Sequence, residues 1–336
     1  MGATPYLAAP WDVIERSQIT VFDAVLRRFK SCRPSQPKGK FMRLSYSSST
    51  LFNGCKRKFY YKKRDYTMDS DSNQDTTALR VGSCFHQIQE DCLHSRGAFT
   101  PEIAKKAFSD NQIEDISQQQ MILAMSQKYW DLHEKQKLII ICCEIEIGDS
   151  NVIGYVDAVM ADQTSGHWYI VDLKTAGRLN SSLLSKLSRD VQLNLYSFYA
   201  SQIAGIHGLD MSKFAGTRYR VTTKCSIKKQ AKESVHEFRD RCYGKVESYD
   251  IFIPVEDLIP KETHEGILKL RDEGIKLLRM PEEDVPQNMS YCENYFKPCE
   301  WFSRCYGHNF TDGAKSLTLT DSINATRVVQ PKEDLL

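Results

Sequence analysis

Residues 154–175 read GYVDAVMADQTSGHWYIVDLKT, and this stretch decides the fold that the sequence predicts. A β-branched and apolar run, residues 152–161, comes first, and an aromatic and β-branched run, residues 167–174, follows it. The polar cluster between them, residues 162–166, is rich in turn-forming residue types. The sequence therefore predicts two antiparallel strands joined by a tight turn.

The acidic residues of this hairpin are expected to face each other. A turn centred between Thr164 and Ser165 pairs Asp157 with Asp172, and such side chains lie about 4.5–5.5 Å apart. Because like charges repel at that distance, a divalent cation between them is the simplest explanation. Lys174 points to the same face as Asp172. Two acids and a lysine are the groups used in metal-assisted phosphodiester hydrolysis, although a slip of one residue would separate the aspartates.

Composition bounds the class of protein. The 336 residues suffice for one large domain or two ordinary ones, and a charged fraction of 26% without low-complexity runs indicates a globular chain. The net charge of +2 decides nothing about nucleic acid. The longest apolar run, residues 138–143, is too short for a membrane span, and the N-terminus lacks the features of a signal peptide. We therefore expect a cytoplasmic protein without a membrane partner.

Cysteine is frequent in this chain, with eleven residues. An odd count without a secretory signal disfavours a disulfide framework. Binding of a metal or a cluster is the more informative alternative.

The remaining pattern predicts an α/β fold in three parts. Residues 1–40, with a helix at 19–29 and a linker, are expected to be an appendage or, equally, a packed extension of the main domain. Residues 41–311 are expected to be the main domain and residues 312–336 a polar tail. Within the main domain, helices are predicted at 77–94, 101–136, 181–206 and 263–280, and further strands at 138–147, 217–223 and 246–254.

Several polar residues outside the hairpin are candidates for the same site. His86 lies on the helix 77–94, where a lone histidine is more often a core or surface group than a ligand. Glu144 and Glu146 share one strand face, and either joins the metal site or faces water. Gln192 and Tyr196 are spaced i, i+4 and share a helix face.

Two basic segments are candidates for nucleic-acid contacts. A short helix capped within 48–50 would carry Cys55 and then a mixture of basic and aromatic side chains. This mixture suits a nucleic-acid backbone with stacked bases, or an amphipathic helix that buries its aromatic rings. Segment 224–232, KCSIKKQAK, is a second candidate, or a solvated loop. The DNA-binding candidates of the first segment are Lys56, Arg57, Lys58, Tyr60 and Lys62.

Four short motifs occur in the order helix, strand, strand, helix. They are Gly82-x-x-x-His86, Gly154-x-x-Asp157, Asp172-x-Lys174-Thr175 and Gln192-x-x-x-Tyr196. With these motifs, residues 43–306 resemble the PD-(D/E)XK nuclease superfamily, specifically its RecB-like exonuclease branch of phage and bacterial type. The resemblance implies a restriction-endonuclease-like core, that is, a mixed central sheet flanked by helices. A helical N-terminal part and a cysteine-bearing C-terminal segment would complete the fold.

The resemblance also implies roles for individual residues. The activity would be metal-dependent exonuclease cleavage of single-stranded DNA or duplex ends in recombination, repair or replication. A helicase or recombinase partner would be a separate chain, because no phosphate-binding loop motif occurs here. The implied roles are Mg²⁺ or Mn²⁺ binding by His86, Asp157, Asp172 and the Leu173 carbonyl, catalysis by Lys174 with Gln192 and Tyr196, and an outer-shell position for Glu144.

Several members of that branch hold an iron–sulfur cluster with one leading and three trailing cysteines. Here Cys55 resembles the leading ligand, and Cys292, Cys299 and Cys305 resemble the trailing ones. The spacing departs from the better-known pattern, since six residues rather than two separate Cys292 from Cys299. Four thiolates suit a 4Fe–4S cluster or, alternatively, a structural Zn²⁺. Either the cluster or the zinc ion would link the start of the domain to its end.

Two other functions remain open at this point. One is a non-catalytic DNA-binding or assembly module that keeps the nuclease fold, which the intact acidic residues, lysine and histidine argue against. The other is an endonuclease of the same superfamily.

Overall fold

The structure is a computed structural model, and it describes residues 42–64, 77–95, 99–180, 190–294 and 297–306. The chain divides between Phe41 and Met42, and all described residues belong to the second unit. The predicted helix at 19–29, the linker that follows it and the tail from 312 lie outside the described residues.

A five-stranded sheet in the order β1-β2-β3-β4-β5 forms the centre of the described unit. The strands are antiparallel neighbours except β3 and β4, which run parallel. A parallel pair needs a crossover connection, and helices α8 and α9 lie within it. The predicted mixed sheet is thus confirmed. The strands are β1 Leu138–Gly148, β2 Ile153–Asp162, β3 Trp168–Ala176, β4 Phe214–Thr223 and β5 Ser248–Pro254.

The hairpin β2–β3 has the predicted register. Ala158 pairs with Val171 and Ala161 pairs with Trp168, as a turn centred between Thr164 and Ser165 requires. The Asp162 carboxylate holds this turn by accepting hydrogen bonds from the backbone N–H groups of Thr164 at 2.9 Å and Ser165 at 2.7 Å. Local turn chemistry therefore sets the alignment of the two strands.

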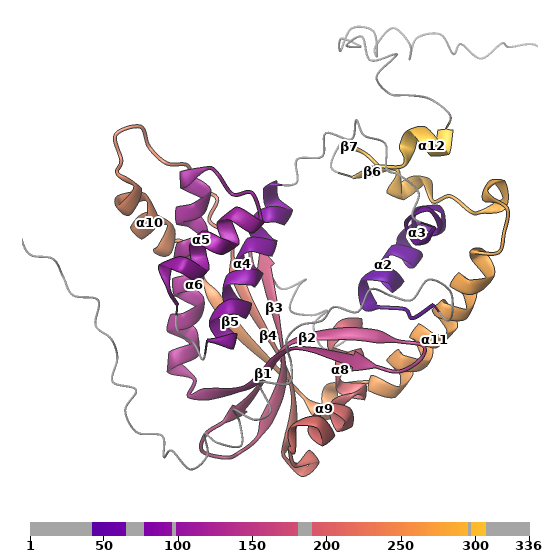
Figure 1. Ribbon diagram of the computed structural model, residues 1–336, viewed down its shortest axis with the longest axis horizontal. Coiled ribbons are helices and arrows are strands. Elements are labelled where there is room, and N and C mark those ends of the chain that lie inside the picture. The colour runs from indigo at the N-terminus through magenta and orange to yellow at the C-terminus, as the bar shows by residue number, and fades with distance from the viewer. Residues whose placement is uncertain (1–41, 65–76, 96–98, 181–189, 295–296, 307–336) are drawn as a thin grey trace, which may run out of the picture. The chain divides into compact units, whose positions relative to one another are not determined.

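Helices cover both faces of the sheet (Figure 1). Helices α4 and α6 pack with Val171 on one face, and α2, α8 and α11 pack with Ile170 on the other. Successive residues of β3 thus enter opposite cores, because strand side chains alternate. The helices are α2 Tyr46–Gly54, α3 Lys56–Lys63, α4 Thr77–His94, α5 Pro101–Asp110, α6 Ile116–Lys135, α8 Val191–Phe198, α9 Ala200–His207, α10 Val235–Tyr243, α11 Pro260–Leu277 and α12 Phe302–Tyr306.

Short elements connect these parts and lead into the cysteine-bearing segment. Single 3₁₀ turns and one two-residue strand pair make up this group. They are η1 Met211–Lys213, η2 Val255–Asp257, η3 Glu282–Asp284, η4 Met289–Tyr291, β6 Glu293–Asn294 and β7 Lys297–Pro298. No helix in the described ranges is both long and apolar enough to cross a bilayer.

Three details of the sequence prediction were wrong. The single helix expected over 101–136 is two helices, because Asp115 caps a new helix by accepting from the Gln118 N–H at 2.8 Å. The segment before Cys55 is a separate helix whose cap is Ser45 rather than a residue of 48–50. Cys55 itself is extended and lies between α2 and α3.

Helix α10 was not predicted, although a signal for it is present. Ser234 and Glu237 form a capping box, in which each side chain accepts from the backbone N–H of the other residue. The S-x-x-E spacing is a start signal that composition alone does not reveal.

Candidate active site

The sheet opens at the two predicted metal-binding aspartates. The β2–β3 ladder ends at the pair Ala158–Val171, one residue before Asp157 and Asp172. From there β2 continues against β1, and β3 continues against β4. The Asp157 carboxylate fills the gap, because its Oδ2 accepts a hydrogen bond of 2.6 Å from the N–H of Leu173. The two aspartates therefore lie on neighbouring strands at the point where the strands separate, and the charge of Asp157 acts on Asp172.

Asp172 is a buried carboxylate that lacks the usual partners. Its side chain is 0% exposed, and within the described ranges neither oxygen accepts a hydrogen bond of good geometry. The ammonium of Lys174 lies 2.9 Å from its Oδ2. Burial and then the charge of Asp157 raise the pKa of Asp172 to about 8, against the effect of Lys174. An unsatisfied buried acid beside a second acid is a donor set that fits a divalent cation.

Lys174 is held by residues of α8. Its Nζ donates to Oε1 of Gln192 at 2.7 Å, and Nε2 of Gln192 donates to the hydroxyl of Tyr196 at 2.9 Å. Burial acts to lower the pKa of Lys174, but Asp172 and Asp157 outweigh it, so the net pKa is raised. The lysine is therefore charged and fixed in position beside the aspartates.

Asp190 positions this helix, and the sequence interpretation missed it. Its carboxylate caps α8 by accepting from the N–H groups of Gln192 at 2.8 Å and Leu193 at 3.4 Å. The signal was an aspartate just before an apolar helical run. Helix α8 begins at Val191, and the helical start predicted at 181 falls within residues 181–189, which lie outside the described residues.

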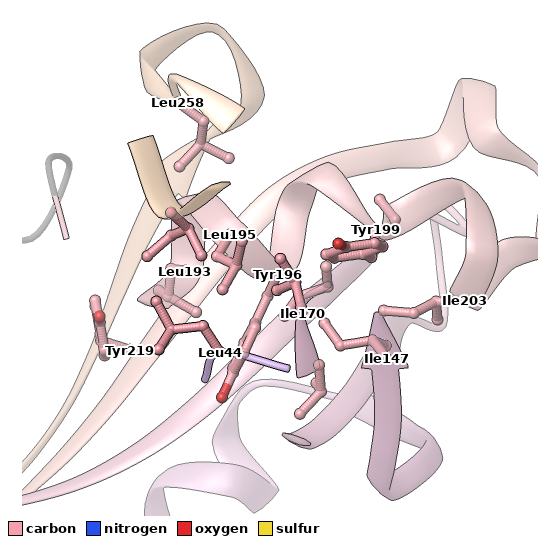
Figure 2. Packing of buried hydrophobic residues seen from close by; sticks show 14 of the residues in the cluster. Leu44, Ile147, Ile170, Leu193, Leu195, Tyr196, Tyr199, Ile203, Tyr219 and Leu258 are labelled. Carbon is pink, nitrogen blue, oxygen red and sulfur yellow. The ribbon is translucent and has the colours of Figure 1, made fainter. Parts of the chain in front are cut away.

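The glycines of two motifs make room for residues of the other motifs. A Cβ on Gly154 would lie 2.8 Å from Cε1 of Tyr196, and a Cβ on Gly82 would lie 3.3 Å from Oγ1 of Thr175. Figure 2 shows Tyr196 within the apolar cluster that also contains Leu44. The four motifs are therefore parts of one packed unit.

His86 reaches this unit from α4. Burial lowers its pKa, and so do the charges of Lys174 and Lys224, while Asp157 raises it. These influences show that the imidazole lies within electrostatic range of Asp157 and of the two lysines. A neutral imidazole is the form that binds metal ions.

The predicted metal shell is not fully assembled. No three His, Cys, Asp or Glu side chains in the described ranges are close enough together to hold a metal ion. The roles of His86, Asp157, Asp172 and the Leu173 carbonyl as ligands therefore remain predictions. Glu144 is exposed and has a φ of 49°, so β1 is irregular there. Its outer-shell role also remains a prediction.

Most of the predicted DNA-binding side chains of α3 make contacts within the protein. Arg57 donates to the carbonyl of Val285 at 2.9 Å, and Lys58 pairs with Glu300 at 2.8 Å. Tyr60 is 1% exposed, and its hydroxyl donates to the carbonyl of Met280. Lys62 is exposed, and Lys56 lies 3.9 Å from Glu273. Contact of these residues with DNA remains a prediction.

The four predicted cluster cysteines come from both ends of the described unit. Cys55 precedes α3, and the N–H of Cys299 donates to the carbonyl of Cys292 at 2.7 Å. Burial raises the pKa of the Cys305 thiol, and the charges of Cys55 and Cys292 add to this. Cys305 therefore lies within electrostatic range of two of the others. All ten cysteines in the described ranges are free, and no three of them are close enough together to hold a metal ion, so the cluster remains a prediction.

One comparison with known proteins identifies the family of this chain. A family model described as "PD-(D/E)XK nuclease superfamily" matches residues 43–306. A solved structure described as "Crystal structure of SSO0001" is 13% identical, with 70% of this chain and 88% of that chain covered and a TM-score of 0.24. No curated protein is significantly similar. Because the family match covers most of the chain and includes all four motifs, the protein belongs to the PD-(D/E)XK nuclease superfamily.

Proposed function

We propose that the protein is a metal-dependent deoxyribonuclease that digests DNA from its ends. The observation that carries this proposal is the fully buried Asp172 carboxylate, which has the Lys174 ammonium 2.9 Å from its Oδ2 and is also exposed to the charge of a second acid, Asp157. One ammonium cannot neutralise two neighbouring carboxylates, whereas a divalent cation would. The superfamily supports nuclease chemistry, whereas digestion from ends is our inference from the resemblance to RecB-like exonucleases.

The residues of the opened sheet would divide the chemistry among them. Asp157 and Asp172, with His86 and the Leu173 carbonyl, would hold Mg²⁺ or Mn²⁺. A bound ion of this kind lowers the pKa of a coordinated water and polarises the phosphate. Lys174, whose Nζ is fixed by Gln192, would orient the attacking water and stabilise the negative charge that develops on the phosphate. Tyr196 holds the Gln192 amide in place.

Digestion of three substrates in Mn²⁺ tests this proposal. Single-stranded linear DNA, blunt duplex and a covalently closed circle are incubated with the wild type and with Asp172→Asn, which keeps the side-chain shape. We expect the wild type to consume linear DNA and spare the circle, and we expect Asp172→Asn to be inactive while folded. Asp240→Asn removes an exposed carboxylate from α10 and should behave as the wild type.

Each alternative predicts a different outcome of the same assay. Cutting of the circle would identify an endonuclease. Binding of linear DNA without cleavage in any divalent cation would identify a non-catalytic module. Wild-type turnover by Asp172→Asn would remove Asp172 from the mechanism.

We further propose that Cys55, Cys292, Cys299 and Cys305 hold a 4Fe–4S cluster. Support comes from the resemblance of these four positions to the cluster cysteines of the RecB-like branch and from the electrostatic influence of Cys55 and Cys292 on Cys305. The described side chains are not grouped closely enough to hold a metal, so the ligand set would have to close around the cluster. The cluster would join the start and the end of the domain, as the contacts from α3 to Val285 and Glu300 also do. Anaerobic purification should yield a brown protein with equal iron and sulfide. A colourless protein that contains zinc would favour the structural zinc site instead.

A further inference from the structure

Lys224 follows strand β4 at the edge of the candidate active site. Its backbone N–H donates to the carbonyl of Ala176 at 2.7 Å, so it lies beside the end of β3. Because β3 and β4 run parallel, with Ala176 paired to Thr223, Lys224 lies at the same end of the sheet as Asp172 and Lys174. Neither the motifs nor the comparisons assign it a role.

The side chain of Lys224 extends toward the helix that carries His86. Its Nζ donates to the carbonyl of Ala78 in the first turn of α4 at 2.9 Å. The same Nζ lies 3.7 Å from the position that a Cβ on Gly82 would occupy. Its charge also acts on His86, one turn further along α4. Lys224 is therefore the second ammonium group, after Lys174, that the structure brings to the motif residues.

The two lysines differ in their partners. The ammonium of Lys174 is 2.9 Å from a carboxylate of Asp172. In the described part of the chain, Lys224 has no carboxylate within ion-pair distance, and its hydrogen bond goes to a neutral carbonyl. Burial lowers its pKa. A half-buried cation without an anion is unfavourable, and an incoming phosphate would relieve this cost.

The chain that follows Lys224 extends the positive charge away from the site. Segment 224–232 contains Lys228, Lys229 and Lys232, of which Lys228 and Lys232 are exposed. The neighbouring acid, Glu233, is already paired with Arg241 at 2.7 Å. The segment that continues from Lys224 therefore presents two exposed lysines, as proteins that track a nucleic-acid backbone do.

We propose that Lys224 binds a DNA backbone phosphate adjacent to the scissile one, and that segment 224–232 continues this contact along the same strand. This inference rests on the proposed nuclease function, since it names a part of the substrate that the same site would bind. The ligand is the phosphodiester backbone, so the contact carries no base preference.

Equilibrium binding without turnover tests this role. A fluorescent single-stranded oligonucleotide is titrated in EDTA at several salt concentrations with the wild type, Lys224→Gln, Lys224→Arg and Lys213→Gln. Lys213 is an exposed lysine of η1 whose Nζ donates to the carbonyl of Ser165 at 3.5 Å, and it serves as the matched control. We expect Lys224→Gln to weaken binding about 5- to 10-fold at low salt and to reduce the salt slope by about 0.7. Lys224→Arg should restore most of the affinity and most of the salt slope. Lys213→Gln should match the wild type in both quantities.

The outcomes separate this inference from the proposed function. If Lys224→Gln binds with the wild-type affinity and salt slope while the wild type digests linear DNA, Lys224 is only a tether to α4 and the nuclease proposal stands. If Lys224→Arg fails to restore binding, the positive charge is not what matters and the inference is overturned. If the wild type neither binds nor cleaves DNA, both proposals fail. Thermal melting of each variant identifies losses that come from unfolding.

Discussion

Replacing Gly154 with alanine is expected to reduce both stability and catalysis, because this glycine lies against Tyr196. A Cβ at position 154 would be 2.8 Å from Cε1 of Tyr196 and 3.2 Å from Cγ1 of Ile147. Tyr196 is 4% exposed, so its ring cannot move into solvent without leaving the core. Overpacking of this kind costs about 1–3 kcal/mol of unfolding free energy. Each kcal/mol lowers the Tm of a domain this large by about 2–4 °C.

The catalytic effect should be larger than the loss of stability alone explains. An ordinary contact of at least 3.4 Å requires the Tyr196 ring to shift by roughly 0.6 Å. That shift moves the hydroxyl to which Gln192 donates, and Gln192 in turn holds Lys174. A misplacement of up to 1 Å in such a chain lowers the rate by about 10- to 100-fold.

Two control variants make this prediction specific. Gly205→Ala places a Cβ in open space within α9 and should gain about 0.5–1 kcal/mol with unchanged activity. Tyr196→Phe removes the hydroxyl and keeps the ring. If Gly154→Ala acts through that hydroxyl, the double variant should be no slower than the slower single variant. A Gly154→Ala enzyme with wild-type Tm and rate, or fully additive losses in the double variant, would refute the reasoning.

Two further predictions concern pH and helix capping. Burial, and then the charge of Arg220, lower the pKa of His133 to about 4. At a pH between about 4 and about 6.5, the unfolded chain therefore binds a proton at this residue that the folded chain does not. Stability in urea should therefore fall by up to about 3 kcal/mol as the pH drops through this window, and a pH profile that His133→Gln leaves unchanged would contradict the assignment. Asp190→Ala should lose about 1 kcal/mol and much of the activity, because the cap that positions Gln192 is removed. Asp190→Asn should retain both, and equal losses in the two variants would show that the carboxylate charge matters rather than the cap.

Local sequence signals predicted the centre of the fold well. The turn at Asp162 and the alternation of the flanking strands determine the register of β2 and β3, and that register was predicted correctly from Ala158–Val171 to Ala161–Trp168. Helix α4 also has the predicted bounds, because its apolar stripe is long and regular.

Contacts between distant segments were beyond the reach of the sequence pattern. The basic and aromatic composition of α3 suggested DNA, yet Arg57 and Lys58 contact residues more than 220 positions away. A helical periodicity does not reveal which partner an amphipathic face packs against. For the same reason, the sequence identified Gly154 as part of a motif but did not show why a glycine is needed there. The structure supplies the reason, because a Cβ at this position would meet the ring of Tyr196.

The dependence of DNA digestion on Mn²⁺ concentration tests the central claim most directly. The rate on a linear substrate is measured from chelated to saturating Mn²⁺ for the wild type, Asp172→Asn and His86→Ala. The account predicts no cleavage in chelator, a saturable rise for the wild type, no activity of Asp172→Asn at any concentration, and a shift of His86→Ala to higher Mn²⁺. Cleavage in chelator, or an Asp172→Asn curve that matches the wild type, would contradict it.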